Sequence, residues 1–255
     1  MRFAILASGS KGNAALVEHG DQLLLIDCGL RFKTLRERMA ELGAAPADLT
    51  AVLITHEHRD HVVGLAAMAR HTGLRPHMTR GTAHQLNFLA DDFIPLAADG
   101  EFELGGLRVR PYTIPHDARE PVHYQLAAGD AVLSFATDIG RSNDYLLEVL
   151  GRSSALVLES NYDPLMLAGN PSYPASLKNR IQGGRGHLSN DEAAALLAAI
   201  NRPALLTVVA AHLSDNNNRP ELPLRLLQES AGRSGHMPAI SVCPQGVPLP
   251  WTELP

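Results

Sequence analysis

Short apolar segments that end at a histidine or an aspartate recur along this sequence, and they constrain its fold more than any other feature. Residues 51–55, 112–115, 133–137 and 207–211 are followed at once by His56, His116, Asp138 and His212. Apolar runs of this length are typical of buried β-strands. Because rigid strands can aim the side chains at their ends towards one point, we expect these four residues to belong to one site.

The densest set of potential metal ligands follows the first of these segments. Within residues 55–62 stand three histidines and one aspartate: His56, His58, Asp60 and His61. Imidazole and carboxylate groups together suit a divalent ion, zinc first, with manganese as the rival. His56 and His58 are two residues apart, so they can point to the same side of an extended or turning chain. Asp60 and His61 can serve a second ion nearby, and the run therefore predicts a two-metal site.

Composition places the chain among globular enzymes. Its 255 residues are 45% hydrophobic and 19% charged, with a net charge of -5, which disfavours non-specific binding of nucleic acid over the whole surface. Cys28 and Cys243 are too few for a disulfide framework, so a cytoplasmic location is expected. The apolar start is too short for a secretory signal, and no stretch approaches the roughly 20 apolar residues that span a bilayer.

The order of the predicted elements favours two packed sheets. Strands are expected at 3–7, 14–18, 22–28, 51–55, 155–159, 205–211 and 239–243, hairpins at 102–114 and 122–137, and a strand-helix unit at 76–89. Helices are expected at 31–42, 62–70, 142–150 and 223–230, and after the capping box Ser189-Asn-Asp-Glu192. Residues 244–255 are expected to form a Pro-rich tail. Strict strand–helix alternation is absent, so we predict one domain, residues 1–255, with two sheets inside and helices outside.

The run Thr55-His-Glu-His-Arg-Asp-His61 resembles the signature of the metallo-β-lactamase-fold hydrolases. The other strand-end residues fall where that superfamily has its remaining motifs, so the resemblance covers essentially the whole chain. It implies an α/β fold, a four-layer αββα sandwich with the site at one rim. The ligands it implies are His56, His58 and His116 for the first ion, Asp60, His61 and His212 for the second, and Asp138 as a bridge. It also implies that Asp27 steadies one ligand from behind.

Several other segments resemble a narrower group, the YycJ/WalJ proteins, which lie near RNase Z and are described as exonuclease-like on DNA. These segments are residues 8–13, 159–163, 186–190 and 211–218. Tyr162 departs from the pattern of that group, in which a histidine is expected. About fifty residues separate Asp138 from His187, which leaves no room for the inserted domain of RNase J-type enzymes. The long arm of RNase Z is not evident either.

Phosphodiester hydrolysis needs an attacking hydroxide and a protonated leaving oxygen. Two divalent ions can generate a bridging hydroxide that attacks phosphorus, and they can clamp the phosphate. A carboxylate keeps a neighbouring imidazole charged and oriented, so we interpret His187 as the general acid and Glu159 as its partner. With the ligand Asp60, these two are the candidate catalytic residues.

The candidate substrate-binding residues carry less specific signals. Ser214, Asn216 and Asn217 can bond phosphate oxygens or, equally, cap the helix that follows. Lys178 and Arg180, together with Arg185, are candidates for a local basic rim that would bind DNA.

Three functions are compatible with these observations. The first is a metal-dependent phosphodiesterase, exonuclease-like, with DNA as substrate. The second is a small-molecule hydrolase, either a thioesterase of the glyoxalase II type or a lactonase, although glyoxalase II has a helical C-terminal extension that is not predicted here. The third is a non-catalytic metal-binding protein, but structural zinc sites are closed and often rich in cysteine. The sequence leaves the oligomeric state open.

Overall fold

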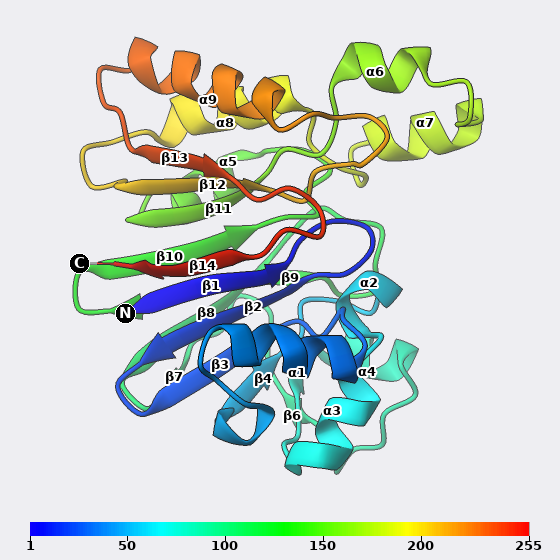
Figure 1. Cartoon of the computed structure of the whole chain (residues 1–255), viewed down its shortest axis with the longest axis vertical. Coiled ribbons are helices and arrows are strands. Elements are labelled where there is room, and N and C mark those ends of the chain that lie inside the picture. The colour runs from blue at the N-terminus through cyan, green and yellow to red at the C-terminus, as the bar shows by residue number, and fades with distance from the viewer. Residues whose placement is uncertain (255) are drawn as a thin grey trace.

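Two seven-stranded sheets lie face to face in the computed structural model, which describes residues 1–254 (Figure 1). The first sheet has the order β14-β1-β2-β3-β4-β5-β6. Its strands are β1 (Arg2–Ala7), β2 (Ala14–His19), β3 (Gln22–Ile26), β4 (Ala51–Leu53), β5 (His77–Met78), β6 (Ile94–Pro95) and β14 (Leu249–Glu253). Strands β14, β1, β2 and β3 pair antiparallel, whereas β3, β4, β5 and β6 pair parallel.

The second sheet has the order β13-β12-β11-β10-β9-β8-β7. Its strands are β7 (Phe102–Leu104), β8 (Leu107–Thr113), β9 (Val122–Ala128), β10 (Ala131–Ala136), β11 (Ala155–Glu159), β12 (Thr207–Ala211) and β13 (Ala239–Val242). The four strands from β10 to β13 run parallel. Parallel strands are covered on both faces, which explains why β11 is apolar up to Glu159 and buried throughout.

Helices cover the outer face of each sheet. On the first sheet these are α1 (Phe32–Glu41), α3 (Leu65–Thr72) and α4 (Arg80–Gln85), and on the second α5 (Asp144–Leu150), α8 (Asn190–Ile200) and α9 (Glu221–Arg233). The short helices α2 (Arg59–Val62), α6 (Pro164–Gly169), α7 (Ala175–Gln182) and η1 (Pro46–Asp48) lie in loops. In Figure 1, α6 and α7 project from the same side of the molecule as α2. The predicted αββα sandwich is confirmed.

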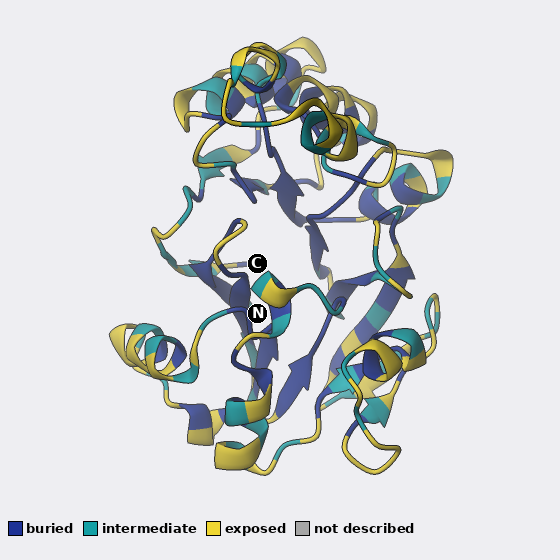
Figure 2. Ribbon diagram, turned by 90° about the vertical axis from the view of Figure 1, so that its right-hand side faces the viewer, coloured by how far each residue is buried: buried dark blue, intermediate teal, exposed yellow. Residues whose placement is uncertain are grey.

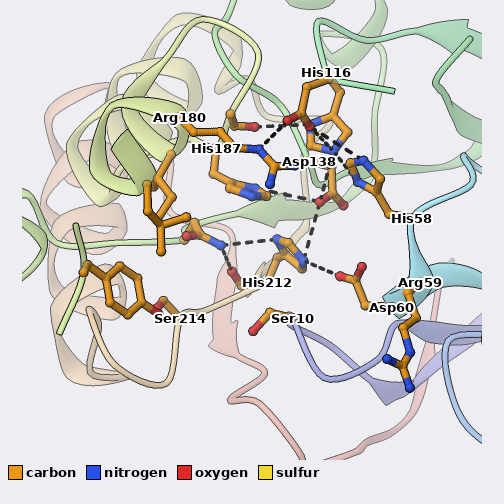
Figure 3. Close-up of a pocket in the computed structure, with 16 residues that line it drawn as sticks. Ser10, His58, Arg59, Asp60, His116, Asp138, Arg180, His187, His212 and Ser214 are labelled. Atoms are coloured by element: carbon orange, nitrogen blue, oxygen red, sulfur yellow. Dashed lines mark hydrogen bonds and ion pairs between the residues drawn. The ribbon is translucent and has the colours of Figure 1, made fainter. Parts of the chain in front are cut away.

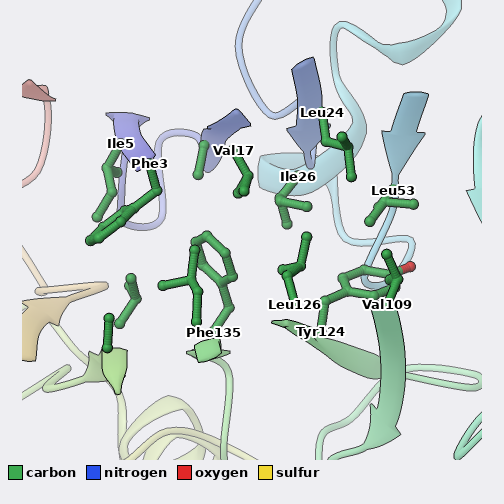
Figure 4. Close-up of a cluster of buried hydrophobic side chains, with 14 of the residues drawn as sticks. Phe3, Ile5, Val17, Leu24, Ile26, Leu53, Val109, Tyr124, Leu126 and Phe135 are labelled. Carbon is green, nitrogen blue, oxygen red and sulfur yellow. The ribbon is translucent and has the colours of Figure 1, made fainter. Parts of the chain in front are cut away.

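The hydrophobic core between the sheets takes side chains from both of them (Figure 4). Phe3 and Ile26 of the first sheet face Leu126 and Phe135 of the second, and each of these side chains is at most 5% exposed. Each strand therefore sends one set of side chains inwards and the next set towards the helices. One further core lies between each sheet and the helices that cover it, which makes two in addition to the central one. Figure 2 shows the result, with buried strands in the middle and exposed helix faces outside.

Three sequence-based expectations need correction. The supposed tail at 244–255 contains β14, which pairs with β1 and completes the first sheet. The helix expected at 62–70 is two helices, α2 and α3, because the chain turns at Val63 and Gly64. Helices α6 and α7 were not predicted, since neither follows the spacing of a core-facing helix.

Other local expectations hold. Ser189 Oγ accepts a hydrogen bond from the backbone NH of Glu192, and the backbone NH of Ser189 donates to the Glu192 carboxylate. These two bonds form the predicted capping box. The β7–β8 hairpin turns at Gly105 and Gly106, whose φ angles of 52° and 87° favour glycine. Within residues 1–254, every helix is too short or too polar to cross a bilayer.

Candidate metal centre

Residues that follow five strands meet at one edge of the two sheets. Asp27 follows β3, His56 follows β4, His116 follows β8, Asp138 follows β10 and His212 follows β12. Asp138 lies at the centre, with Oδ1 3.6 Å from His212 Nε2 and 3.9 Å from His116 Nε2 (Figure 3). The fold thus brings together the strand-end residues that the sequence singled out.

His56, His58 and His116 form the first candidate set of ligands. One ring nitrogen from each lies within 4.8 Å of the others. The Nδ1 atom of His116 donates to the carbonyl of Gly186 at 3.3 Å, which leaves its Nε2 facing His58 Nδ1 at 3.1 Å. The Nδ1 atom of His56 bonds the hydroxyl of Thr55 at 2.9 Å, so its Nε2 is the atom left for a metal ion. Partners outside the set therefore orient the rings of His56 and His116.

Asp60, His61 and His212 form the second candidate set, again with donor atoms within 4.8 Å of one another. Asp60 Oδ2 lies 3.6 Å from His61 Nε2 and 3.8 Å from His212 Nε2. Asp138 reaches this set as well, because its Oδ2 is 3.4 Å from His61 Nε2. A carboxylate that contacts both sets is placed as a bridge between two ions would be.

The chemistry of these side chains fits divalent ions. Among residues 1–254, His56 Nε2, Asp138 Oδ2 and His212 Nε2 are buried without a hydrogen-bond partner. Buried polar atoms are nearly always satisfied, so three orphaned atoms in one place indicate that something else binds them. Burial lowers the pKa of His61, but the charges of Asp27 and Asp138 outweigh it and raise that pKa to about 9. The carboxylates thus favour positive charge here, as a metal centre requires.

Asp27 lies directly behind His61. Its Oδ2 accepts from His61 Nδ1 at 2.7 Å, and its Oδ1 accepts from the backbone NH of Thr55 at 2.9 Å. The hydroxyl of Thr55 contacts both carboxylate oxygens and also His56 Nδ1, so one buried group joins the two sets of ligands. The expected place of Asp27 is found, whereas sequence reasoning missed the part played by Thr55.

Glu159 holds two histidines at once. Its Oε1 accepts from His187 Nδ1 at 2.9 Å and from His212 Nδ1 at 2.8 Å. Its Oε2 accepts from the backbone NH groups of Ile139 and Leu188. Burial raises the pKa of Glu159, but the charge of His187 and these hydrogen bonds lower it to about 2. The predicted Glu159–His187 pair is present, and the contact to His212 adds a link to the metal ligands that was not predicted.

The turn between β1 and β2 and the start of the loop after β11 supply three further residues that contact the site. Asn13 Nδ2 lies 3.0 Å from His61 Nε2 and 3.3 Å from Asp60 Oδ2. The backbone NH of His212 donates to Ser8 Oγ at 2.7 Å, and Asn161 Nδ2 donates to its carbonyl at 2.8 Å. We interpreted residues 8–13 only as a turn that resembles the YycJ/WalJ group, and that resemblance was the signal that could have identified Ser8 and Asn13.

A cavity of about 330 Å³ opens above the candidate ligands. Some of the candidate substrate-binding residues line it and others do not. Ser214 and Arg180 line it, although Arg180 Nε is held by Asp117 Oδ2 at 2.6 Å. Asn216 lines a neighbouring groove. Lys178 and Asn217 do not line the cavity: the former donates to the carbonyl of Ala168, and the latter bonds Asn170 and Ser214. Tyr162 is buried outside it.

Comparison with known proteins assigns the family. The model of the beta-lactamase superfamily domain matches residues 23–209. This chain belongs to the metallo-β-lactamase superfamily. As a member, it is 33% identical over 228 residues to exodeoxyribonuclease YycJ of Bacillus anthracis, across 87% of this chain and 86% of that one. Exodeoxyribonuclease WalJ of Streptococcus pneumoniae serotype 2 is 31% identical, across 87% of this chain and 84% of that one.

A solved structure has the same fold. The metallo-β-lactamase fold protein YhfI from Bacillus subtilis superimposes with a TM-score of 0.73 at 14% identity, covering 97% of this chain and 98% of that one. The family model and the two relatives confirm the superfamily, the similarity to YycJ/WalJ proteins and the expectation of an enzyme, and the solved structure confirms the fold.

Proposed function

We propose that this protein is a dinuclear metal-dependent phosphodiesterase that degrades DNA as an exonuclease. The observation that carries the proposal is the Glu159–His187 pair, which lies against two sets of metal ligands within one cavity. The names of the two exodeoxyribonuclease relatives point the same way. Zinc is the expected metal from the ligand types, with manganese as the rival. A cytoplasmic location and a single domain remain predictions.

The ligand roles in this proposal follow the geometry. His56, His58 and His116 would hold one ion, Asp60, His61 and His212 the other, and Asp138 would contact both. When bound, the two ions would supply a nucleophile at neutral pH and neutralise the charge of the phosphate.

His187 has the position of a proton donor. Its Nδ1 is engaged by Glu159, which leaves Nε2 as the free nitrogen on a ring that lines the cavity. Burial lowers the pKa of His187, but the charge of Glu159 outweighs it and the net pKa is raised. The raised pKa favours the protonated imidazole, which is the form that can protonate the leaving oxygen of a phosphodiester.

The surroundings of the cavity support a polyanionic substrate. One adjoining groove, lined by Arg31 and Arg59, shares Ser10, Arg59 and Asp60 with the cavity. A second groove, lined by Arg141 and Arg185, shares Asp117, Arg180 and Gly186 with it. Arginines on both sides of a metal site can bind the phosphates that flank the one being cleaved. The proposed basic rim keeps Arg180 and Arg185 and adds Arg31, Arg59 and Arg141. Lys178 donates to the carbonyl of Ala168 instead.

The first test is a cleavage assay with the purified protein and each metal in turn. End-labelled single- and double-stranded DNA and RNA should be compared with the thioester S-lactoylglutathione. We expect DNA to be shortened from an end. Turnover of the thioester alone would refute the proposal and favour the glyoxalase II type of hydrolase.

The second test addresses His187. We expect His187→Ala to lower turnover by roughly 10²–10⁴-fold, the usual contribution of a general acid, while metal content stays at two ions per chain. His84→Ala, a change at an exposed histidine on α4, is the matched control and should leave both unchanged. His187, Asp138 and His212 also offer donor atoms within 4.8 Å of one another. Loss of metal from His187→Ala would therefore make His187 a ligand instead.

A further inference from the structure

Helix α7 has an apolar face that contributes to none of the hydrophobic cores. Leu177 and Ile181 are four residues apart on the helix, so their side chains lie on one side of it. Tyr173, which lies just before α7, lines the same cavity as these two residues. All three are only partly buried, and no residue of α7 is fully buried. None of them belongs to the three core clusters found within residues 1–254. Packing in a hydrophobic core therefore does not explain why these three positions carry apolar or aromatic side chains.

Polar contacts hold α7 in place. Arg180 Nε donates to Asp117 Oδ2 at 2.6 Å, and Lys178 Nζ donates to the carbonyl of Ala168 at 2.7 Å. The backbone NH of His187 donates to the carbonyl of Ile181 at 2.9 Å. None of these three attachments uses the side chain of Tyr173, Leu177 or Ile181. Those side chains are available to a ligand.

The apolar face of α7 forms one wall of the catalytic cavity. Tyr173, Leu177 and Ile181 all line the same space as Asp138, His187 and His212. The cavity therefore has a charged wall, which carries the metal ligands, and an apolar wall, which carries an aromatic ring. Its volume of about 330 Å³ suits a small molecule or a single nucleotide, and not a duplex.

We propose that the face formed by Tyr173, Leu177 and Ile181 binds the base of the nucleotide that is removed, with Tyr173 as the stacking surface. This inference rests on the proposed function, because it assumes that the phosphate of that nucleotide lies at the metal ligands. A nucleotide matches the two walls of the cavity, because its phosphate is charged and its base is flat and largely apolar. Asn216 Nδ2 lies 3.2 Å from the hydroxyl of Tyr173 and steadies the ring from its far edge.

Stacking on tyrosine also has a consequence for specificity. Every base presents a π-face, so an aromatic wall tolerates all four bases while it rejects a nucleotide that has none. The loss of one stacked base weakens binding by about tenfold. We therefore expect little preference among the four bases and a clear preference for a base over none.

The experiment compares oligonucleotides that end in an ordinary nucleotide with ones that end in the abasic analogue tetrahydrofuran, at either end of the strand. The quantity measured is the ratio of kcat/KM for removal of the two terminal residues. We expect a ratio of about ten for the wild-type enzyme, near one for Tyr173→Ala, and near the wild-type value for Tyr173→Phe, which keeps the ring. The matched control is Leu165→Ala, which removes an 84% exposed side chain on α6 outside the cavity and should keep the wild-type ratio.

Two results would overturn the inference. A wild-type ratio near one would show that the base is not recognised, although DNA is cleaved. A ratio that stays high in Tyr173→Ala, with both substrates slowed equally, would show that Tyr173 only supports the fold. Failure of the wild type to cleave any oligonucleotide would instead refute the proposed function, and the inference with it.

Discussion

Three residues of the metal centre have unusual backbone angles. Asp27, Asp138 and His212 have φ values of 60°, 55° and 58°, in the left-handed region that residues other than glycine seldom adopt. Such a conformation costs on the order of 1–3 kcal/mol per residue and persists only where its surroundings hold it. For His212 these surroundings include Ser8, Glu159 and Asn161. All three residues directly follow a strand or lie two residues beyond it, so the positive φ values occur where the chain leaves the sheet for the site.

Asp27 offers a test of this support. Asp27→Asn keeps the shape and tolerates the positive φ, but it removes the charge that orients His61. We expect the affinity for the ion at Asp60, His61 and His212 to fall about 10–100-fold, while the other ion stays bound. Metal content after dialysis against buffers of known free zinc gives the two affinities.

The matched control for this variant is Asp99→Asn. Asp99 has a similar φ of 61° but bonds Thr113 and Tyr145, away from the metal centre. Wild-type metal content in Asp27→Asn would show that Asp27 only stabilises its turn.

The two cysteines provide a test that depends on pH. Burial raises the pKa of Cys28 and of Cys243 to about 12, and each residue is at most 1% exposed. The thiolate is the reactive form, so reactivity should appear only as the pH approaches that value. We expect no alkylation by iodoacetamide at about pH 8 in the folded protein, and two modified thiols per chain in denaturant. Rapid labelling of the native protein at that pH would contradict the buried positions.

Gly29, which lies between β3 and α1, is packed tightly against the backbones of two loops of the site. A Cβ atom there would come within 1.8 Å of the carbonyl oxygen of Asp60 and 2.5 Å of the backbone nitrogen of Asn13. The backbone NH of Asn13 donates to that same carbonyl at 2.7 Å, so any side chain on residue 29 would separate two loops that carry site residues.

We therefore expect Gly29→Ala to lower the free energy of unfolding by about 1–3 kcal/mol, as overpacking does, and to weaken the binding of the ion at Asp60. Urea unfolding and metal analysis measure the two effects. Gly169→Ala is the control, because nothing lies within 4 Å of the added atom on α6. Equal stability of the two variants would mean that the loops can separate without cost.

The elements differ in how far the sequence could predict them. Strands such as β11 and the capping box at Ser189 carry local signals, and they form where expected. Strand β14 was mistaken for a tail because Pro250 within it and Pro248 just before it hide a pairing with β1, which depends on the distant start of the chain. Helix α7 was missed because its apolar residues face a cavity and not the core.

In the site, too, some features have a local sequence signal and others do not. The sequence could single out its candidate ligands because they follow recognisable strands and match a family signature. The hydroxyl of Thr55, the amide of Asn13 and the second contact of Glu159 depend on how distant segments meet, and no local pattern reveals them. Lys178 illustrates the same limit, since the sequence shows its charge but not that its Nζ donates to the carbonyl of Ala168.

For the whole molecule, the core between the sheets draws on both halves of the chain. We expect one cooperative thermal transition in calorimetry, because neither sheet can keep its inner face buried without the other. Two separate transitions would contradict the prediction of a single domain.

Metal removal should shift that transition. An ion present at 100 times its dissociation constant stabilises the folded protein by about 2.7 kcal/mol. For a chain of this size that corresponds to roughly 5–10 °C in Tm. Calorimetry with and without a chelator measures the shift, and an unchanged Tm would show that the ions are not coupled to folding.

The pairing of β14 with β1 also decides how the protein can be handled. Arg2 lies opposite Glu253, and the backbone NH of Leu254 donates to the carbonyl of Met1 at 2.8 Å. In Figure 1 both ends lie on the side opposite α2 and α7. A tether or fusion partner attached at either end would leave the cavity facing outwards. Immobilised enzyme should therefore keep its access to long DNA, whichever end is anchored.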